Sequence, residues 1–113
     1  PDAGTLANGA MDGAFFETYV VTEIIKSYYN AGKTADFYYY RDTDKKEIDF
    51  LILRGNQAYP IEIKKSKNPT RPNRHFGVLD KLGLETQPGI VICMSDELVP
   101  YDRTTWLLPV YAL

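Results

Sequence analysis

The chain has 113 residues, of which 44% are apolar and 25% are charged, a composition typical of one globular domain. Its net charge of −2 excludes a strong overall positive field of the kind that attracts nucleic acid from a distance. No apolar run reaches the ~20 residues that a membrane helix needs, and the single cysteine, Cys93, excludes an internal disulfide. We therefore expect a cytoplasmic domain that does not enter a membrane.

The first residues have the composition of a linker. Residues 1–9 are rich in Gly, Asp and Asn, and the chain begins with Pro1 rather than Met. We interpret residues 1–9 as a linker remnant and residues 10–113 as a single domain cut from a longer protein. Asn8 is a candidate N-cap for a helix over residues 10–30.

The predicted helix carries one acidic residue in an unusual place. Its end at Asn30-Ala31-Gly32 has the composition of a C-cap. Helical spacing predicts an apolar stripe made of Gly13, Ala14, Val20, Val21, Ile24 and Tyr28. Glu17 falls in the middle of this stripe, where a carboxylate is costly unless it is paired or binds a metal ion. The alternative is a buried glutamate that is hydrogen-bonded to backbone or to Arg41.

A β-hairpin is the strongest local prediction. Residues 36–41 are aromatic enough for a strand, and residues 42–45 form a turn. Two apolar runs then flank Gly55-Asn56, a dipeptide suited to a two-residue hairpin turn. In that register, residue numbers facing each other sum to 111, so Asp49 faces Glu62.

The hairpin gathers charged residues at the end away from its turn. Lys64 lies two residues after Glu62 and therefore projects from the same face, opposite Glu47. Facing carboxylates repel one another unless a cation lies between them or they reach solvent. The remaining side chains alternate, with Ile48, Phe50, Ile52, Tyr59, Ile61 and Ile63 expected on one face of the hairpin, and Leu51, Leu53, Ala58, Pro60 and the charged trio on the other.

The second half of the chain predicts a short helix and two strands. The helix covers residues 73–82, with Phe76, Leu79 and Leu82 buried. Residues 89–94 form a continuous apolar run, which is typical of a parallel strand buried on both faces. Residues 105–111 form a last strand, in which Pro109 indicates an edge position. His75, the only histidine, is interpreted as a loop or helix-start residue.

A basic segment follows the hairpin. Residues 64–74 contain five cations and no acid. Besides Lys64, these are Lys65, Lys67, Arg71 and Arg74. The segment is either a solvated loop or a surface that neutralises the phosphates of a nucleic acid.

The ordered set of elements and charges resembles the PD-(D/E)XK nuclease superfamily. The set is a helix with Glu17, a strand with Asp49, and a strand with Glu62-Ile63-Lys64. Closer still, Gly13-Ala-Phe-Phe-Glu17, Tyr40-Arg41, Glu47-Ile-Asp-Phe-Leu-Ile and Ile61-Glu-Ile-Lys-Lys resemble the C-terminal domain of a prokaryotic family of AAA-type ATPases, a restriction-endonuclease-like domain of undetermined function. Ile48 stands where the superfamily name has proline.

This resemblance implies a fold and a site. The fold is a restriction-endonuclease-like three-layer α/β/α domain with a central mixed sheet and an αβββαβ core. Asp49, Glu62 and the Ile63 carbonyl would bind Mg²⁺ or Mn²⁺, which are hard cations that take oxygen ligands. Glu17 would contribute through water or hold a second ion. Lys64 would position or deprotonate the attacking water, or stabilise the charge that develops on the phosphate. The implied partners are an N-terminal ATPase module of the same protein and DNA.

Three functions follow from these residues. The first is a metal-dependent endonuclease domain joined to an ATPase. The second is a binding module that keeps the nuclease fold and reads DNA or a protein without cutting. The third is a structural or oligomerising appendage, in which the charges form only salt bridges such as Glu47–Lys64. The complete charged set favours the first two functions over the third.

Overall fold

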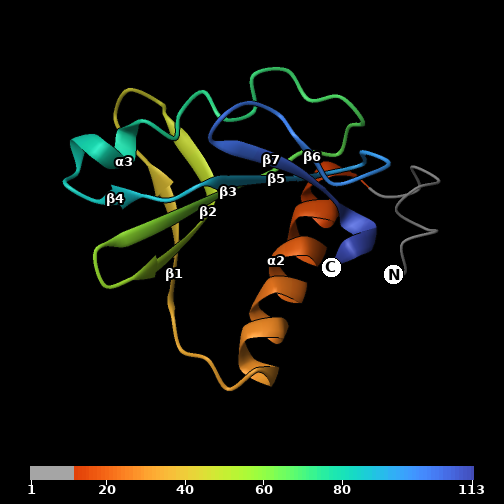
Figure 1. Ribbon diagram of the computed structural model, residues 1–113, viewed down its shortest axis with the longest axis horizontal. Helices are drawn as coiled ribbons and strands as arrows, with labels where there is room; N and C mark the ends of the chain where they lie inside the picture. The colour runs from red at the N-terminus through yellow and green to blue at the C-terminus, as the bar shows by residue number, and fades with distance from the viewer. Residues whose placement is uncertain (1–11) are drawn as a thin grey trace.

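The computed structural model describes residues 12–113, which form a mixed β-sheet with helices packed against it (Figure 1). In chain order the elements are α2 (Gly13–Asn30), β1 (Asp36–Arg41), β2 (Glu47–Arg54), β3 (Gln57–Ile63), α3 (Val78–Lys81), β4 (Glu85–Thr86), β5 (Gly89–Cys93), β6 (Val99–Pro100), β7 (Thr105–Pro109) and a final 3₁₀ turn (Val110–Ala112). Asn8 and the rest of the expected linker, residues 1–9, lie outside the described residues.

Helix α2 begins at Gly13, later than the expected residue 10. Asp12 is the N-cap, and its Oδ1 accepts a hydrogen bond of 2.8 Å from the backbone N–H of Phe15. This bond satisfies one of the N–H groups that a helix leaves unpaired in its first turn. At the other end Gly32 adopts a φ of 68°, which ends the helix as the sequence predicts.

The apolar side of α2 is rotated from the predicted stripe. The fully or nearly buried residues of the helix are Phe16, Val20 and Ile24, whereas Gly13 and Ala14 are exposed. The large ring of Phe16, which the predicted stripe omitted, sets this orientation because it contributes the most apolar area. Glu17 is therefore half-buried at the margin of the stripe, and the prediction that it lies in the middle is wrong.

The β2–β3 hairpin forms in the predicted register. Phe50 pairs with Ile61 and Arg54 with Gln57, so facing residue numbers sum to 111. Gly55 in the turn has a φ of 61°, a conformation that glycine adopts without the steric cost of a Cβ atom. The hairpin joins a sheet with the order β1-β2-β3-β5-β7-β6, in which β4 also pairs with β3.

A β-bulge shifts the side chains at the start of β2. Tyr38 pairs with Leu51, but Tyr40 pairs with Ile48, so β2 contains one more residue than β1 between these pairs. Ile48 consequently packs with Leu51 rather than with Phe50, and its predicted face is wrong. An extra residue in one strand reverses the alternation of side chains from that point.

The second half of the sheet is parallel, as the apolar run of β5 predicts. Strand β5 pairs in parallel with both β3 and β7, and Val91, Ile92 and Cys93 are almost wholly buried. Strand β7 is not the edge strand of the sheet, because β6 pairs with its other side. Pro109 itself is nevertheless uncovered on that side, because it is the last residue of β7 and β6 pairs only with Trp106 and Leu107.

The helix predicted over residues 73–82 is much shorter. Hydrogen-bonded turns occupy residues 73–77, and only α3 is helical. Phe76 and Leu79 are buried as predicted, but Leu82 is 53% exposed because the helix ends there and Gly83 follows with a φ of 78°. The two-residue strands β4 and β6 were not predicted, since they carry no apolar alternation of their own.

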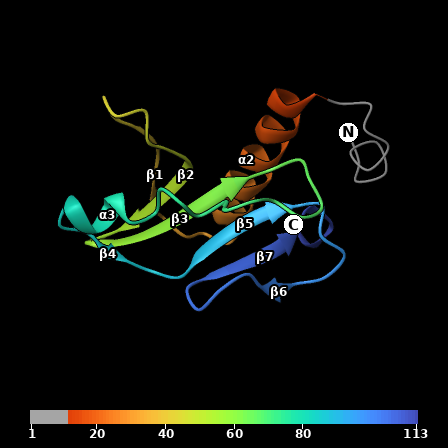
Figure 2. The same ribbon diagram turned by 90° about the horizontal axis from the view of Figure 1, so that it is seen from above.

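Both faces of the sheet are covered, as Figure 2 shows for α2 and α3. Helix α2 packs Phe16, Val20 and Ile24 against one face, together with Phe50 and Ile92. On the other face, α3 and the turn before it form a second cluster, made of Ile48, Leu51, Ala58, Phe76, Val78 and Leu79. The described residues thus form a mixed α/β domain with one seven-stranded sheet and two α-helices.

Candidate functional site

The candidate site lies where the antiparallel pairing of β2 and β3 stops. Phe50 and Ile61 are the last paired residues on this side of the hairpin. Beyond them, the Asp49 side chain replaces the β2 backbone as the hydrogen-bond acceptor. Its Oδ2 accepts a hydrogen bond of 2.9 Å from the N–H of Ile63. Lys64 N–H then donates to the Ile92 carbonyl of β5 at 3.0 Å. The site therefore adjoins a central strand of the sheet.

Glu62 is the most perturbed group of the site. It is only 6% exposed, and its carboxyl group is hydrogen-bonded to Asp49. Burial, followed by this hydrogen bond and by the negative charge of Asp49, raises the pKa of Glu62 to about 9. Lys64, with its Nζ at 3.7 Å from Glu62 Oε1, and Arg74 oppose this rise. Glu62 therefore holds a proton at neutral pH.

Glu17 approaches the same site from α2. Burial raises its pKa, and the charge of Asp49 raises it further, whereas Lys64 lowers it. Glu17 and Asp49 also line a common depression of about 310 Å³ between α2 and strand β1. The structure thus brings all four predicted residues, Glu17, Asp49, Glu62 and Lys64, into one neighbourhood.

The donor set suits a cation that keeps several waters. Among residues 12–113, no three acidic, histidine or cysteine side chains lie close enough together to hold a metal ion, so Glu17 does not complete a three-carboxylate group. Asp49 and Glu62 provide two carboxyl groups, and the proton that Glu62 holds can be replaced by a cation. Mg²⁺ is commonly held by only one or two carboxylates, with water and substrate phosphate as its other ligands.

The Ile63 backbone fits this donor set. The N–H and C=O of one strand residue point to the same side of the strand. Because the Ile63 N–H points to Asp49, its carbonyl faces the β2 side as well. Residues that fit a hard divalent cation are therefore Asp49, Glu62 and the carbonyl of Ile63.

The basic segment after β3 is anchored to the sheet rather than fully solvated. Its backbone is held at Ser66, whose carbonyl accepts from Met94 N–H at 2.8 Å, and at Arg71, whose N–H donates to the Tyr101 hydroxyl at 3.1 Å. Lys67 forms an ion pair of 3.0 Å with Asp96. Arg74 lies close enough to Glu62 to lower its pKa. Arg71 and Arg74 are exposed, and Lys65 is half-buried.

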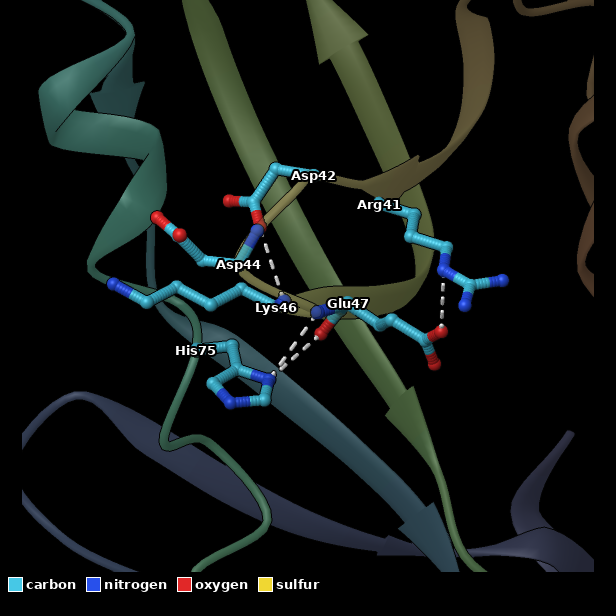
Figure 3. A network of polar contacts seen from close by, with 6 residues as sticks. All are labelled: Arg41, Asp42, Asp44, Lys46, Glu47 and His75. Carbon is cyan, nitrogen blue, oxygen red and sulfur yellow. Dashed lines mark hydrogen bonds and ion pairs between the residues drawn. The ribbon is translucent and has the colours of Figure 1, made fainter.

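A second polar network borders the site and was not predicted (Figure 3). The Arg41 guanidinium pairs with Glu47 at 3.3 Å, and Lys64 pairs with Glu62. The structure therefore does not contain the predicted ion pair of Glu47 with Lys64. It also does not contain the alternative bond of Glu17 with Arg41. The Nδ1 of His75 accepts from the Glu47 N–H at 3.2 Å, and His75 lies in the turn before α3, as the sequence predicts for a loop residue. Asp42 closes the β1–β2 turn by accepting from Lys46 N–H at 3.0 Å.

The sequence analysis also missed two aromatic residues of the site. Tyr38 and Tyr39 line the same depression as Glu17 and Asp49, and both are about half exposed. The aromatic run of β1 was interpreted only as a signal for a strand. The exposure of Tyr38 and Tyr39 follows from the position of β1 at the edge of the sheet. The sequence alone did not establish that position.

Comparison with known proteins gives a family but no activity. No helix in the part of the chain that the structure describes is long and apolar enough to span a membrane. No curated protein matches the chain, and no solved structure matches it. A family model described as a domain of unknown function, DUF4143, matches residues 12–113, which is almost the whole chain. The chain therefore belongs to the DUF4143 family.

Proposed function

We propose that this domain is a metal-dependent nuclease-like domain that acts on DNA phosphodiester bonds. The observation that carries the proposal is the meeting of Asp49, the buried Glu62 and the Lys64 ammonium group at one end of β3. A buried carboxyl group beside a second carboxylate is costly to the fold, and a purely structural ion pair needs only one of them. Two oxygen ligands beside an amine are instead suited to phosphate chemistry.

Each residue of the site has a proposed role. Asp49, Glu62 and the Ile63 carbonyl would hold Mg²⁺ or Mn²⁺, which when bound supplies a Lewis acid and a water of lowered pKa. Lys64 would position the attacking water or stabilise the charge that develops on the phosphate. Glu17 would act through water, since it lies near Asp49 but does not complete a three-carboxylate group.

The basic segment would hold the DNA backbone. Lys65, Arg71 and Arg74 follow the site directly in the chain, and Arg74 is near enough to influence Glu62. Lys67 already pairs with Asp96, so its contact with phosphate would require this exposed ion pair to open. The segment would thus supply the contacts that fix the scissile bond beside the carboxylates.

The proposal extends to the fold and to a partner. We interpret the α/β architecture as restriction-endonuclease-like, on the strength of the motif order and of α2 packing against the sheet that carries Asp49 and Glu62. The residues that resemble the C-terminal domain of AAA-type ATPases also favour an N-terminal ATPase module in the same protein. ATP hydrolysis would then control when the site meets DNA.

The decisive experiment is a nicking assay with Lys64→Ala. Supercoiled plasmid is incubated with Mn²⁺ and either this chain or the longer protein that joins it to an ATPase module. We expect nicking that Lys64→Ala abolishes, with Mn²⁺ binding retained, because lysine is not a ligand. Lys26→Ala is the matched control, since Lys26 is an exposed lysine of α2 whose ion pair among residues 12–113 is with Glu23, at 3.5 Å.

One observation favours a second candidate function, a DNA- or protein-binding module without catalysis. In the described residues Glu17 does not join Asp49 and Glu62 in a three-carboxylate group, so nothing there supports the second ion that the resemblance allows at Glu17. If the protein binds DNA in a salt-dependent manner but never nicks it in Mg²⁺ or Mn²⁺, the nuclease proposal is wrong and the binding module replaces it.

A further inference from the structure

Helix α2 has apolar residues on two opposite sides. One side packs against the sheet through residues that include Phe16 and Val20. The other side lies at the outside of the molecule (Figures 1 and 2), where Phe15, Ile25 and Tyr29 are 52%, 40% and 84% exposed. A surface helix of a globular protein ordinarily has one apolar side and one charged side, whereas a helix that is apolar all round is buried in its working state. The outer side of α2 therefore has the composition of a surface that another layer covers.

The exposed residues form a regular stripe along the helix, which we call the outer stripe. Its five members are spaced by three and four residues in turn, a spacing that keeps them on one side of a helix. They are Phe15, Thr18, Thr22, Ile25 and Tyr29, and none of the five is charged. Helical geometry places Thr22, in the middle of the stripe, about 160° around the helix axis from the buried Val20.

The polar groups of Thr18 and of the neighbouring residues do not oppose burial of the outer stripe. Thr18 Oγ1 donates to the Ala14 carbonyl at 3.0 Å, so this hydroxyl keeps its hydrogen bond when another surface covers it. Next to the stripe, Lys26 pairs with Glu23 at 3.5 Å on the same helix. The surface that matches the outer stripe is therefore itself uncharged and apolar.

The outer stripe is symmetric about its middle. Phe15 and Tyr29 each lie seven residues from Thr22, and the two intervening members, Thr18 and Ile25, lie four and three residues from it. Beside the middle the surface is hollowed by a depression of about 370 Å³. This depression is lined by Ala14, Glu17, Thr18, Val21 and Thr22. The stripe thus has small residues and a hollow at its centre, and an aromatic residue at each end.

A stripe with this symmetry matches a second copy of itself. A two-fold axis brings the same surface of both chains together, so each contact occurs twice. With the axis at Thr22 the two helices run antiparallel, and Phe15 of one chain lies against Tyr29 of the other. The positive end of each helix dipole then lies beside the negative end of the other, which is favourable. The two Lys26 residues lie about 12 Å apart along the helices, a distance at which 0.1 M salt largely screens their repulsion.

The exposed area determines how strong such a dimer is. A buried aromatic side chain contributes roughly 150–250 Å², so Phe15 and Tyr29 together offer roughly 200–340 Å² in each chain. A standard interface buries about 800 Å² per partner. Even with Ile25 and the two threonines the outer stripe provides less than this, so the dimer is weak and its fraction rises with protein concentration.

We infer that the outer stripe is a dimer interface, in which two copies of this chain pack their α2 helices antiparallel about Thr22. The inference does not rest on the proposed nuclease function, because no residue of the stripe is assigned to the candidate site. It does affect that site, since Glu17 lines the depression beside the stripe. The second copy therefore lies next to Glu17 of the first.

The test measures the molecular mass of this chain by sedimentation equilibrium in EDTA, from micromolar to millimolar concentration. We expect a reversible increase from the mass of the monomer to twice that mass. Thr22→Glu brings two carboxylates together at the axis, and this repulsion should weaken dimerisation by about tenfold or more. Thr22→Lys should have the same effect. An equal mixture of the two variants should dimerise again, because the axis then joins opposite charges.

The controls separate contact at the stripe from folding and from total charge. Ser27→Glu introduces the same charge at an exposed position of α2 outside the stripe, so it should dimerise as the unaltered chain does. Melting curves identify any Thr22 variant that fails to fold, and recovery of the dimer in the mixture shows that both variants are folded.

Three results would overturn the inference, and none of them depends on nicking activity. If the unaltered chain keeps the mass of a monomer up to millimolar concentration, the outer stripe binds a partner other than a second copy. If Ser27→Glu weakens the dimer as much as Thr22→Glu does, charge alone explains the effect. If the mixture of Thr22→Glu and Thr22→Lys stays monomeric, the two copies do not meet at Thr22.

Discussion

Replacing Glu62 with glutamine tests the electrostatics of the site directly. In the folded chain the pKa of Glu62 is raised to about 9, compared with an ordinary value of 4.5. Between these two values the folded protein holds a proton that the unfolded chain releases, so the unfolding free energy falls as pH rises through this window. Glutamine is neutral at every pH, and its amide can donate to Asp49 as the protonated carboxyl group does. Glu62→Gln should therefore lose this part of the pH dependence.

The expected loss of unfolding free energy follows from the pH range between the unfolded and folded pKa values of Glu62. One proton difference corresponds to about 1.4 kcal/mol per pH unit, so the unaltered chain should lose up to roughly 3 kcal/mol of unfolding free energy between pH 6 and pH 8 relative to Glu62→Gln. Urea unfolding in EDTA, followed by the fluorescence of Trp106, measures this difference at each pH. Titrating groups that do not interact with Glu62 contribute equally in the two proteins and cancel in the comparison.

A matched control and a clear contrary result complete the test. Glu97→Gln changes an exposed glutamate in the turn after β5, and its pH profile should follow that of the unaltered chain. Parallel profiles for Glu62→Gln and the unaltered chain from pH 6 to pH 8 would mean that Glu62 is already ionised at pH 6. The proton on Glu62, and the reasoning that a cation replaces it, would then be wrong.

Three further predictions concern the metal, the DNA and the fold. Mn²⁺ should raise the melting temperature of the unaltered chain by linkage, with about 2.7 kcal/mol of stabilisation when its concentration is 100 times the dissociation constant. The melting temperature of Asp49→Asn should not change. The site is refuted if calorimetry detects no heat of binding at millimolar Mn²⁺. Arg71→Glu/Arg74→Glu should weaken DNA binding and reduce its salt slope by about 1.8 if both cations contact phosphates, and an unchanged slope in a fluorescence anisotropy titration would exclude them. Gly89→Ala should destabilise the fold by about 1–3 kcal/mol in urea unfolding, because the new Cβ would lie 2.4 Å from the buried ring of Phe76. Gly77→Ala, where a Cβ meets no atom within 4 Å, is its control, and equal stability of the two variants would show that Phe76 can move aside.

The hairpin could be predicted because its information is local. Gly55 adopts the positive φ that the turn requires, and this single conformation fixes the register of every pair up to Phe50 and Ile61. The proximity of Asp49 and Glu62 follows from the same register, without any knowledge of the other strands. The charged pair was therefore accessible from the sequence.

The failures arise where a distant element decides. The β-bulge that turns Ile48 to the other face of the sheet arises from the pairing of β1 with β2. No residue of β2 alone predicts this bulge. The orientation of α2 depends on where the Phe16 ring fits against the sheet, which shifts Glu17 to the margin of the buried side. The partner of Glu47 is Arg41 because the bulge brings the end of β1 beside it, while Lys64 turns to Glu62.

Asp49 and Glu62 carry different weight as evidence for a function. Asp49 accepts the Ile63 N–H, which would otherwise lose its partner at the point where the hairpin pairing stops. A purely structural domain would therefore also keep an aspartate or asparagine at this position. Glu62 does not satisfy a backbone group in this way. It is buried in a central strand beside another acid, where an apolar residue or glutamine would stabilise the fold more than glutamate does. The proposed cation would offset the cost of Glu62, so the proposal of a cation site depends on Glu62 more than on any other residue.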